Sequence, residues 1–587
     1  MRVAFAAWRE RFTAGLKTPL GLILLAAALI RLVGLTWGLP SSDGWDNDGI
    51  APRDFLPGLI ETFTPGHYFT YPPAQFVVLA ILSLPVTLVM VASSPSLAPH
   101  DIIAEAVKVP FMTAYAVIAR AVAIAMSVAI IWAVAKLVEL AAGKRAGTLA
   151  GAACATNIIL TYYGQTTNLD VPYLFWGCFS LLELARVVAN DEPHRLRRVA
   201  IFGALAVATK DQAYALFVLS LPLTLLAWSI TSAFPRANVR AVLKELAVAA
   251  GLGLGLLLFV DGALVNPSGF RERVAFLTGP ASQPYAYYSA DLHGRSLAAL
   301  DSLLKFQSYY PLLYALPLAL GLFRLGSLEK RSRIVALIPL FAIVSYTLFF
   351  NCVARRTEHR FLLPQMTLWG AYVGLGADWM LSLGPDIVRR VTRAVLAVAV
   401  MWGAFLAVDV EANLLLDPRY DAEAWLRANV KPGDMIEVHG KNVYLPRFPV
   451  QAHVVRVGLD PIGGRNPLPG VEEKQDKFTD IAARHPNWIV VDEGFGGQIV
   501  RDAHASENTS GRVFSQMQLA TKENADITTF FTGLVAGTEG YQMVHLSTWP
   551  SSFWPRLDIH ASTARDVWIF APSGRAPAAA TRSAPLP

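Results

Sequence analysis

Long apolar segments recur through the first 415 residues of the chain, and they constrain its fold more than any other feature. Each approaches the roughly 20 residues that an α-helix needs to cross a bilayer. Hydrophobic residues make up 54% of the 587-residue sequence and charged residues only 16%, whereas soluble proteins carry about 25% charged residues. The sequence therefore predicts an α-helical polytopic membrane protein with about 11–13 transmembrane helices.

The first apolar run, from Thr18 to Leu39, follows several basic residues and ends in bulky side chains. A signal peptide has a shorter apolar region and a small-residue cleavage site, so we expect a retained helix with a cytoplasmic N-terminus. Further spans are expected at 73–92, 109–140, 146–163, 170–189, 198–209, 212–233, 241–265, 297–323, 333–350, 361–383 and 393–414.

Basic clusters lie at the mouths of five short loops, and the positive-inside rule makes those loops cytoplasmic. They include Lys144, Arg197, Arg240, Arg331 and Arg390. The intervening loops are then extracytoplasmic, at 164–170, 210–211, 266–296 and 351–360. This orientation predicts a multi-pass protein of the cytoplasmic (inner) membrane. The same basic loops explain the net charge of +6, and no alternation of Arg with aromatic residues indicates nucleic-acid binding.

After Leu416 the composition changes to that of a soluble α/β domain. Asp421–Asn429 has a helical pattern, and short apolar runs such as Met435–His439, Trp488–Asp492 and Tyr541–Ser547 are typical of strands. We therefore predict three parts: a transmembrane module at 1–416 with its first external loop at 40–72, an extracytoplasmic α/β domain at 417–570, and a disordered tail rich in Ala, Pro, Ser and Thr at 571–587.

Several classes of function are disfavoured by absent motifs. The three cysteines lie in or beside apolar runs, which is typical of core residues and not of a redox or metal framework. The sequence has no Walker loop, no GxGxxG motif opening a βαβ unit, no HExxH and no CxxC. These absences argue against a nucleotide-powered pump and against a zinc protease.

The first external loop carries four carboxylates within a dozen residues: Asp43, Asp46, Asp48 and Asp54. Neighbouring carboxylates above a membrane repel one another unless a cationic or hydroxyl-rich group engages them. They form either a site or a solvated acidic loop with an Asx turn. The adjoining amphipathic stretch, Phe55–Phe63, and the aromatic segment after it favour a site, because such anchors hold the loop near the headgroups.

Basic side chains also recur on the outer face, where the positive-inside rule predicts few. They are Lys210 in one loop, Arg271 and Arg273 in a second, and Arg355, Arg356, His359 and Arg360 in a third. Guanidinium groups bind phosphate oxygens bidentately, and Lys acts as a point charge. The alternatives are snorkelling onto headgroups, or pairing of Arg355 and Arg356 with Glu358. Because the whole set departs from the orientation rule, a phosphate-bearing ligand at the outer surface is favoured.

Asp170 lies at the start of an external helix, within the segment Thr166–Pro172. An Asp at this place, with Pro in the first turn, is an ordinary cap and a favourable partner of the helix dipole. A contact with substrate is the alternative. Both interpretations stay open at the level of sequence.

Taken in order, these motifs resemble the GT-C glycosyltransferases. The resemblance covers about residues 15–415 and points to the branch of protein O-mannosyltransferases and of the aminoarabinose transferase that modifies lipid A. It is carried by Asp46-Asn47-Asp48, Tyr71-Pro72-Pro73, Thr166–Pro172, Thr209-Lys210 and His359–Pro364. The chain departs from the family in two places: the family usually has Asp-Glu or Asp-x-Asp in the first loop, whereas Gly49 follows Asp48, and Tyr71 stands where the sugar transferase has Lys.

The resemblance implies a GT-C fold and a sugar donor built on a polyprenyl phosphate. It further implies a hydroxyl-bearing acceptor (a glycan, lipid or protein) and inversion at the anomeric carbon. A carboxylate must take the proton of the acceptor hydroxyl, and the resemblance assigns that role to Asp48 or to Asp46. Cations stabilise the leaving phosphate; the assigned partners are Arg356, Arg360 and Lys210, with His359 and Arg273 as lesser candidates and with Asp170 and Tyr71 as substrate contacts.

A metal is not generally needed in this branch. Paired carboxylates nevertheless suit Mg or Mn, so an ion at Asp46 and Asp48 is left open, and no other cofactor is expected. The C-terminal domain is a candidate for binding the acceptor through Tyr444–Arg447 and Trp488, although core packing of these aromatic residues is the favoured interpretation.

Two other classes of function are weighed against the transferase. One is a transporter or flippase of lipid-linked sugars, and the other is a non-catalytic membrane scaffold that displays the C-terminal domain. Transporters usually have paired halves and polar residues at the middle of the membrane. In this chain the ionisable residues gather instead at the outer ends of the predicted spans, which favours the enzyme.

Overall fold

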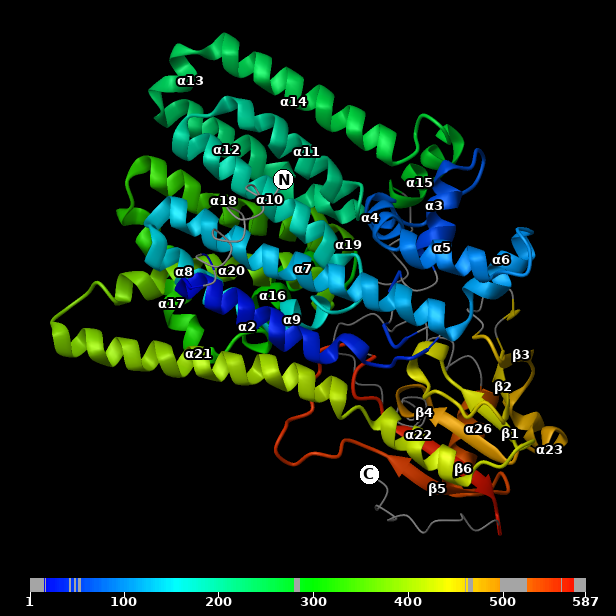
Figure 1. Ribbon diagram of the computed structural model, residues 1–587. Coiled ribbons are helices and arrows are strands. Elements are labelled where there is room, and N and C mark those ends of the chain that lie inside the picture. The colour runs from blue at the N-terminus through cyan, green and yellow to red at the C-terminus, as the bar shows by residue number, and fades with distance from the viewer. Residues whose placement is uncertain are drawn as a thin grey trace. The chain divides into compact units, whose positions relative to one another are not determined.

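The computed structural model describes residues 15, 17–41, 44–46, 49–50, 54–278, 286–459, 461–462, 468–496, 525–560 and 562–574. The chain divides into two compact units (Figure 1). The membrane unit consists of Met1–Leu35, Asp48–Pro85 and Val117–Glu411, and the C-terminal unit of Thr36–Asn47, Val86–Ala116 and Ala412–Pro587. No local sequence signal assigns the two early segments to the second unit. The predicted tail lies outside the described residues from position 575 onward.

Helices make up the membrane unit. In chain order they are α2 (Pro19–Val33), α3 (Phe55–Phe63), α4 (Ala74–Leu82), α7 (Val109–Ala142), α8 (Lys144–Ala155), α9 (Ile158–Tyr163), α10 (Asp170–Asn190), α11 (Leu196–Val207), α12 (Phe217–Thr231), α13 (Ala233–Ala237), α14 (Val239–Val260), α15 (Pro267–Thr278), α16 (Leu292–Leu304), α17 (Ala315–Arg324), α18 (Lys330–Tyr346), α19 (Cys352–Ala354), α20 (His359–Met380) and α21 (Asp386–Leu415). Both α7 and α21 continue across a unit boundary.

Seven helical segments of the described chain are long and apolar enough to cross a membrane, or eight if the pair α4 and α5 (Leu84–Ser93), bent by 64°, is one span. These eight coincide with eight of the predicted runs. The other predicted runs coincide with shorter, interrupted or less apolar helices. The run predicted at 146–163 is divided at Asn157, whose side chain accepts a hydrogen bond from the Leu160 amide and caps α9.

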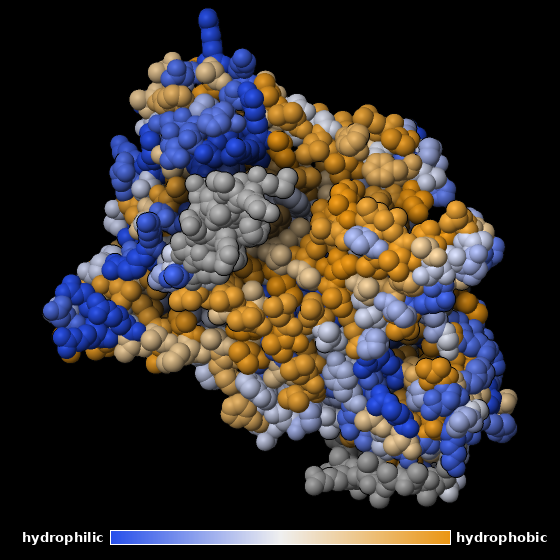
Figure 2. Space-filling view, in the orientation of Figure 1, coloured by the Kyte–Doolittle hydropathy of each residue, from blue (hydrophilic) through white to orange (hydrophobic). Residues whose placement is uncertain are grey.

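Small residues allow close packing of the helices in the membrane unit. A Cβ on Gly321 of α17 would overlap the carbonyl oxygen of Tyr372 in α20, and a Cβ on Gly376 of α20 would overlap that of Pro317. No hydrophobic driving force holds helices together in lipid, so the close van der Waals packing that small residues allow stabilises their association. Apolar side chains are spread over much of the face seen in Figure 2. Leu22 and Leu29 of α2 are among the exposed large hydrophobic residues.

The C-terminal unit contains a six-stranded sheet in the order β3-β2-β1-β4-β6-β5. Its strands are β1 (Met435–His439), β2 (His453–Gly458), β3 (Val471–Gln475), β4 (Trp488–Asp492), β5 (Tyr541–Ser547) and β6 (Val567–Pro572). Neighbours among the first four strands are parallel, and β6 pairs antiparallel with both β4 and β5. The central strands β1 and β4 have the limits expected from their apolar runs.

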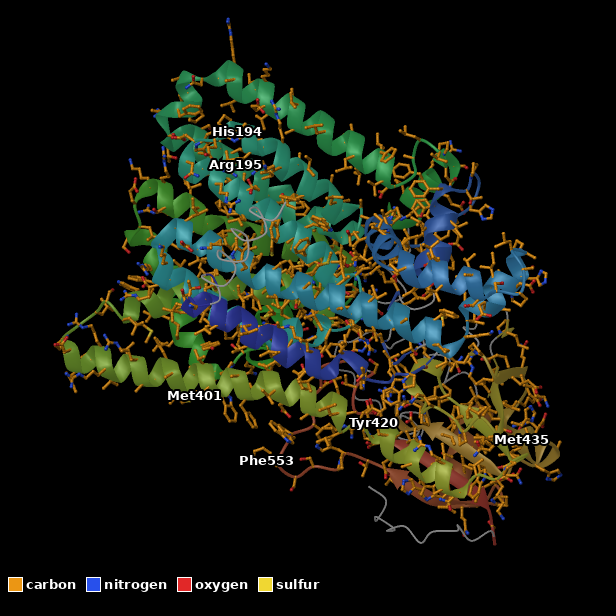
Figure 3. The ribbon with its side chains drawn as sticks, in the orientation of Figure 1. His194, Arg195, Met401, Tyr420, Met435 and Phe553 are labelled. Carbon is orange, nitrogen blue, oxygen red and sulfur yellow. The ribbon has the colours of Figure 1, made fainter. Side chains whose placement is uncertain are left out.

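Helices cover both faces of this sheet. One core contains Trp425 and Leu426 of α22 (Pro418–Asn429), and the other contains Phe530 and Phe531 of α26 (Ala525–Ala536). The unit also contains α6 (Pro99–Ala106) and α23 (Ile481–Arg484). Figure 3 labels Tyr420 in the first turn of α22 and Met435 at the start of β1. Trp488 is buried in the first core with its ring edge-on to Trp425, so core packing describes this candidate.

Candidate active site

Three of the predicted phosphate-binding side chains converge on one aromatic ring in the membrane unit. The Lys210 ammonium lies 5.6 Å from the centre of the Phe361 ring, and the guanidinium carbons of Arg356 and Arg360 lie 4.5 Å and 4.7 Å from it. The face of an aromatic ring attracts cations. We call these three cations the cation cluster. Each is partly exposed, so an anion of matching size can reach them.

The backbone explains how Arg356 and Arg360 come to the same ring. The chain turns sharply after α19, where Arg355 adopts a left-handed conformation with φ of 54°. The buried Asn351 amide donates hydrogen bonds to the carbonyl oxygens of Arg356 and Phe361. This clamp holds the turn in place, so that α20 begins at His359 with the two arginines on either side of it.

Lys210 is held by a buried carboxylate. Its Nζ lies 2.7 Å from Oδ1 of Asp170, which has no exposed surface, whereas the lysine side chain is 14% exposed. Asp170 is the first residue of α10 and follows the N-cap residue Leu169, so its charge suits the helix dipole. Its second oxygen, Oδ2, is buried and makes no hydrogen bond to a described residue.

Two carboxylates, those of Glu358 and Asp170, partly balance the positive charge of the cation cluster. Nη2 of Arg356 lies 2.5 Å from Oε1 of Glu358, so this part of the alternative proposed from the sequence is present. Nη1 of Arg355 donates to the Tyr288 carbonyl at 2.8 Å. Three cations against the carboxylates of Glu358 and Asp170 leave one net positive charge, which favours an anionic ligand.

His359 is the first residue of α20. Its Nδ1 is 2.9 Å from the Tyr309 hydroxyl, and the two rings meet edge to face. The neighbouring Tyr287 binds the Arg355 carbonyl through its backbone amide. Burial and the nearby Glu358 charge raise the pKa of Tyr287 to about 12, although the Arg356 charge opposes the rise. Tyr287 is therefore a neutral hydroxyl beside the cluster.

Arg273 belongs to a second charged group. Its guanidinium is 1% exposed, pairs with Asp211, lies 3.7 Å from Asp261 and stacks on Phe69 at 5.0 Å. Burial raises the pKa of Asp261 to about 7; Arg273 opposes this and the Asp211 charge adds to it. Asp211 directly follows Lys210, so the backbone joins this group to the cation cluster. Nε of Arg273 is buried and makes no hydrogen bond to a described residue.

The Tyr71-Pro72-Pro73 segment lies beside the Lys210 loop. The Ala74 amide donates to the Ala208 carbonyl at 2.8 Å, which fixes the start of α4 next to the end of α11. Both prolines are buried, and Tyr71 is half-buried. The structure thus places Tyr71 near the loop that carries Lys210.

The two candidate bases are Asp48 and Asp46, and the structure describes only the second. Asp48 lies outside the described residues. Within the membrane unit, the amide of Ile50 donates to the Thr167 carbonyl at 3.2 Å. This bond ties the chain just after Asp48 to the turn that leads into Asp170. Asp46 belongs to the C-terminal unit and is 6% exposed.

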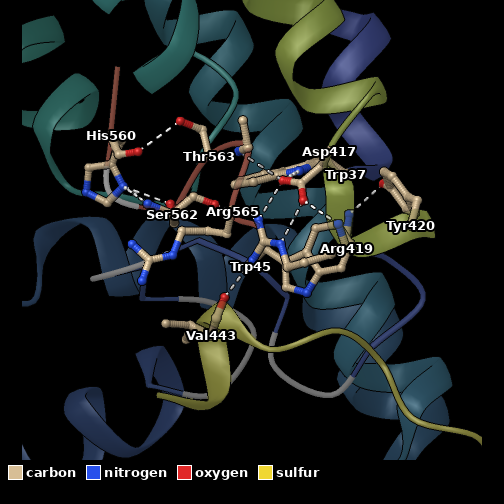
Figure 4. Close-up of polar contacts among 12 residues, drawn as sticks. Trp37, Trp45, Asp417, Arg419, Tyr420, Val443, His560, Ser562, Thr563 and Arg565 are labelled. Atoms are coloured by element: carbon tan, nitrogen blue, oxygen red, sulfur yellow. Dashed lines mark hydrogen bonds and ion pairs between the residues drawn. The ribbon is translucent and has the colours of Figure 1, made fainter. Parts of the chain in front are cut away.

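An arginine that the sequence analysis missed holds the loop before Asp46 (Figure 4). Arg419 is fully buried and bonds Asp417 through two nitrogens, at 2.9 Å and 2.7 Å. Its guanidinium lies 3.9 Å from the Trp45 ring centre, and Nε1 of Trp37 donates to Asp417 at 3.2 Å. The only available signal was the pair of tryptophans that brackets the loop.

Tyr444 and Arg447, the other candidates in the C-terminal domain, have internal partners. Arg447 pairs with Glu423 at 2.6 Å and lies 5.5 Å from the Trp45 ring. The Arg565 guanidinium lies 4.2 Å from the Tyr444 ring. Over the part of the chain that the structure describes, no group of three or more His, Cys, Asp or Glu side chains could hold a metal ion. Asp48 is not included in that search.

Comparison with solved structures identifies the fold. No protein-family model and no curated protein sequence matches the chain. Its structure is similar to that of ArnT from Cupriavidus metallidurans bound to undecaprenyl phosphate, with a TM-score of 0.51 and 14% identity over 82% of this chain and 94% of that one. The apo state of that ArnT has a TM-score of 0.49, and the match covers 85% of this chain and 95% of that one. The oligosaccharyltransferase AglB from Archaeoglobus fulgidus has a TM-score of 0.41 at 14% identity, and the match covers 92% of this chain and 80% of that one. The chain therefore has the GT-C fold that its motifs predicted.

Proposed function

We propose that this protein is a membrane glycosyltransferase that moves a sugar from a polyprenyl-phosphate donor to a hydroxyl acceptor. The convergence of Lys210, Arg356 and Arg360 on Phe361 carries the proposal. Similarity in fold to an ArnT that binds undecaprenyl phosphate supports a lipid-phosphate donor. The cation cluster supplies what such a donor requires, because its leaving group is a phosphate whose negative charge grows during the reaction.

The chemistry follows from the residues. The acceptor oxygen attacks the anomeric carbon as the bond from that carbon to the phosphate oxygen breaks, which inverts the configuration. The acceptor proton passes to the carboxylate of Asp48 or Asp46, because a neutral hydroxyl is a poor nucleophile. Arg356 and Arg360 hold the phosphate oxygens in bidentate fashion, and Lys210 adds a point charge. The departing product is the polyprenyl phosphate.

The remaining candidates have supporting roles. Asp170 fixes the position of Lys210, and Tyr71 lines the approach to the same loop. His359 and Arg273 lie at the margins of the cluster and contact the phosphate or the sugar. The positive-inside rule orients the loops at 210–211 and 351–360 to the extracytoplasmic side of the inner membrane, and the C-terminal domain follows on that side.

Release of polyprenyl phosphate tests this proposal. Purified protein in detergent is given a panel of polyprenyl-phosphate sugars, and the freed lipid phosphate is measured. We expect one donor class to be consumed, and Arg356→Gln with Arg360→Gln to weaken binding of undecaprenyl phosphate at least tenfold. Arg389→Gln is the matched control, since Arg389 is a partly exposed arginine on α21 that pairs with Asp386. Unchanged lipid-phosphate affinity in the double variant would reject the phosphate role.

The same assay separates the enzyme from a flippase. A flippase moves the intact donor across vesicles without releasing lipid phosphate. Two buried ionisable residues lie at helix ends: Arg31 in the last turn of α2, and Glu411, bonded to Gln165 at 2.6 Å, near the end of α21. Arg120, which is also buried, lies within α7, so release of lipid phosphate and not the placement of charge decides between the two functions.

A further inference from the structure

The sheet of the C-terminal unit has a point where its strand order reverses. From β1 the chain moves outward to β2 and β3 and then returns to place β4 on the other side of β1. In open α/β sheets, ligands bind outside the carboxyl ends of the strands at such a switch point. Here β1 ends at His439 and β4 at Asp492. Gly440 follows β1 with φ of 131°, and a Cβ there would lie 2.9 Å from the Cβ of Asp492.

A cavity lies at the same edge of the sheet, next to the switch point: its lining residues follow β4 or precede β6 and do not include the end of β1. Its volume is about 320 Å³, within the range of roughly 300–1,000 Å³ that small-molecule sites occupy. The antiparallel register pairs Asp492 with Val567, so the residues just before β6 come to the same edge as the end of β4. The side chains that matter for its chemistry are Glu493, Arg556, Asp558, His560, Arg565 and Asp566.

Ion pairs and hydrogen bonds hold the wall of the cavity in place. Arg565 binds the fully buried Asp492 through Nε at 2.8 Å, and Arg556 pairs with Asp566 at 3.0 Å. The Glu493 amide donates to the Asp566 carbonyl at 3.0 Å. These bonds fix the charged groups of the wall, so a ligand does not have to order them.

The charges of the lining select the class of ligand. The lining has the carboxylates of Glu493, Asp558 and Asp566 and the guanidinium groups of Arg556 and Arg565, together with His560, so that neither sign dominates. A phosphate would face Glu493 and Asp558, and a cation would face Arg556. Hydroxyl groups both donate and accept hydrogen bonds, and a polyhydroxylated ligand can therefore satisfy both kinds of side chain. Phe553, labelled in Figure 3, is 71% exposed on the same β5–β6 connection.

We propose that this cavity binds a carbohydrate, namely the glycan part of the acceptor. The proposal rests on the proposed transferase function and names the place where one substrate is held. It goes beyond the sequence analysis, which named Tyr444–Arg447 and Trp488 as the acceptor candidates of this domain and did not include the residues that line the cavity.

The cavity is linked to the loop that leads to Asp46. Arg419 donates to the Ser562 carbonyl at 2.5 Å, and the Ala564 amide donates to Asp417 at 3.3 Å (Figure 4). Ser562 and Ala564 flank Thr563 of the cavity wall. The same Asp417–Arg419 pair contacts the two tryptophans ahead of Asp46. The Asp417–Arg419 pair is thus bonded both to the segment that forms part of the cavity wall and to the tryptophans of the first external loop.

Direct binding of sugars tests the proposal. Full-length protein in detergent is titrated with fluorescent oligosaccharides of mannose, glucose, galactose, arabinose and N-acetylglucosamine, and binding is followed by anisotropy. We expect at least one of them to bind saturably, and Glu493→Gln and Asp558→Asn each to weaken that binding at least tenfold with unchanged thermal unfolding. The matched control is Glu472→Gln, an exposed glutamate of β3 paired with His453.

Three results would overturn the proposal: no oligosaccharide binds, the cavity variants bind as well as the control, or a random peptide library competes better than sugar. Binding of undecaprenyl phosphate is measured on the same variants and should not change. Loss of lipid-phosphate binding in the Arg356 and Arg360 variants with intact sugar binding confirms that the two sites are separate. If lipid phosphate binds nowhere while sugar binding persists, the transferase function fails and the glycan site stands.

Discussion

The ammonium of Lys210 lies 2.7 Å from the carboxylate of Asp170, 40 positions earlier in the chain, at a place where Asp170 has no access to solvent. The lysine lies at the same time 5.6 Å from the Phe361 ring. A buried carboxylate thus holds a partly exposed cation against the cation cluster. Asp170 acts through Lys210, so it is a positioning residue for the proposed phosphate site.

This pair predicts a particular pattern in a double-mutant cycle. Lys210→Gln leaves an uncompensated buried carboxylate, which costs about 3–5 kcal/mol of stability, and it should also weaken donor binding. Adding Asp170→Asn removes the unpaired charge, so the double variant should regain most of the thermal stability without regaining donor affinity. Melting curves and lipid-phosphate titrations measure the two effects. Recovery of donor affinity in the double variant would reduce Lys210 to a structural role.

The two candidate bases can be separated by conservative substitution. Asp48→Asn should lower sugar transfer at least about 10²-fold, because the amide cannot accept the proton of the acceptor. Expression and binding of polyprenyl phosphate should stay as they are. Asp46→Asn is compared in the same assay, and Asp54→Asn serves as the control for a neighbouring carboxylate of the loop. Full transfer by both the Asp46 and the Asp48 variant would refute a carboxylate base in this loop.

We expect substitution of Arg419 to loosen the first external loop and to leave the affinity for the donor unchanged. Arg419→Gln breaks the paired hydrogen bonds to Asp417 and the contact with Trp45, so amides at 36–46 should exchange hydrogen faster. A loop displaced by about 1 Å can cost roughly 10²-fold in rate; we expect a fall in kcat of that order or smaller, with the donor KM unchanged.

Two variants define that experiment. Arg419→Lys keeps the charge and should recover part of the rate, although it lacks the planar fork. Arg427→Gln changes an exposed arginine on the same helix and should have no effect. Normal exchange at 36–46 in the Arg419→Gln protein would contradict the role proposed for this arginine.

Glu437 predicts an acid-sensitive part of the stability of the C-terminal unit. Burial alone would raise its pKa, but hydrogen bonds from Arg484, at 2.7 Å and 2.8 Å, bring the pKa down from 4.5 to about 2. A carboxyl whose pKa is lowered by folding stabilises the protein above its unfolded pKa and loses this effect as the pH falls through the folded value. The stabilisation is therefore complete above about pH 4.5 and disappears towards pH 2.

The lowering of the Glu437 pKa corresponds to roughly 3 kcal/mol in the free energy of unfolding. Glu437→Gln should lower the melting temperature at pH 7, and the difference from the unaltered protein should narrow below pH 4.5. Glu472→Gln, at an exposed position of the neighbouring β3, should show no such dependence. A difference in melting temperature that does not change between pH 7 and pH 3 would contradict this account.

Local sequence was sufficient for part of the fold. Met435–His439 and Trp488–Asp492 were predicted as strands with the limits that β1 and β4 have, because a strand buried on both faces is a continuous apolar run. The order of the strands was not predictable in this way, since pairing is set by contacts between distant segments. The run at 146–163 was predicted as one span, yet Asn157 caps a new helix within it.

Sequence also singled out the side chains of the cation cluster by type and by their position in loops predicted to be extracytoplasmic, but not their meeting point at Phe361. It missed Arg419, because Asp417-Pro418-Arg419 resembles an ordinary helix start. Its partners, Trp37 and Trp45, lie far away in the chain.

The sequence by itself determined that the chain lies in a membrane and which loops are charged, because hydropathy and charge are sums over neighbouring residues. Only the tertiary structure decided which charges meet. Electrostatic and packing energies depend on distances through space, and Lys210 and Arg356 are brought to one ring by helices that lie far apart in the chain.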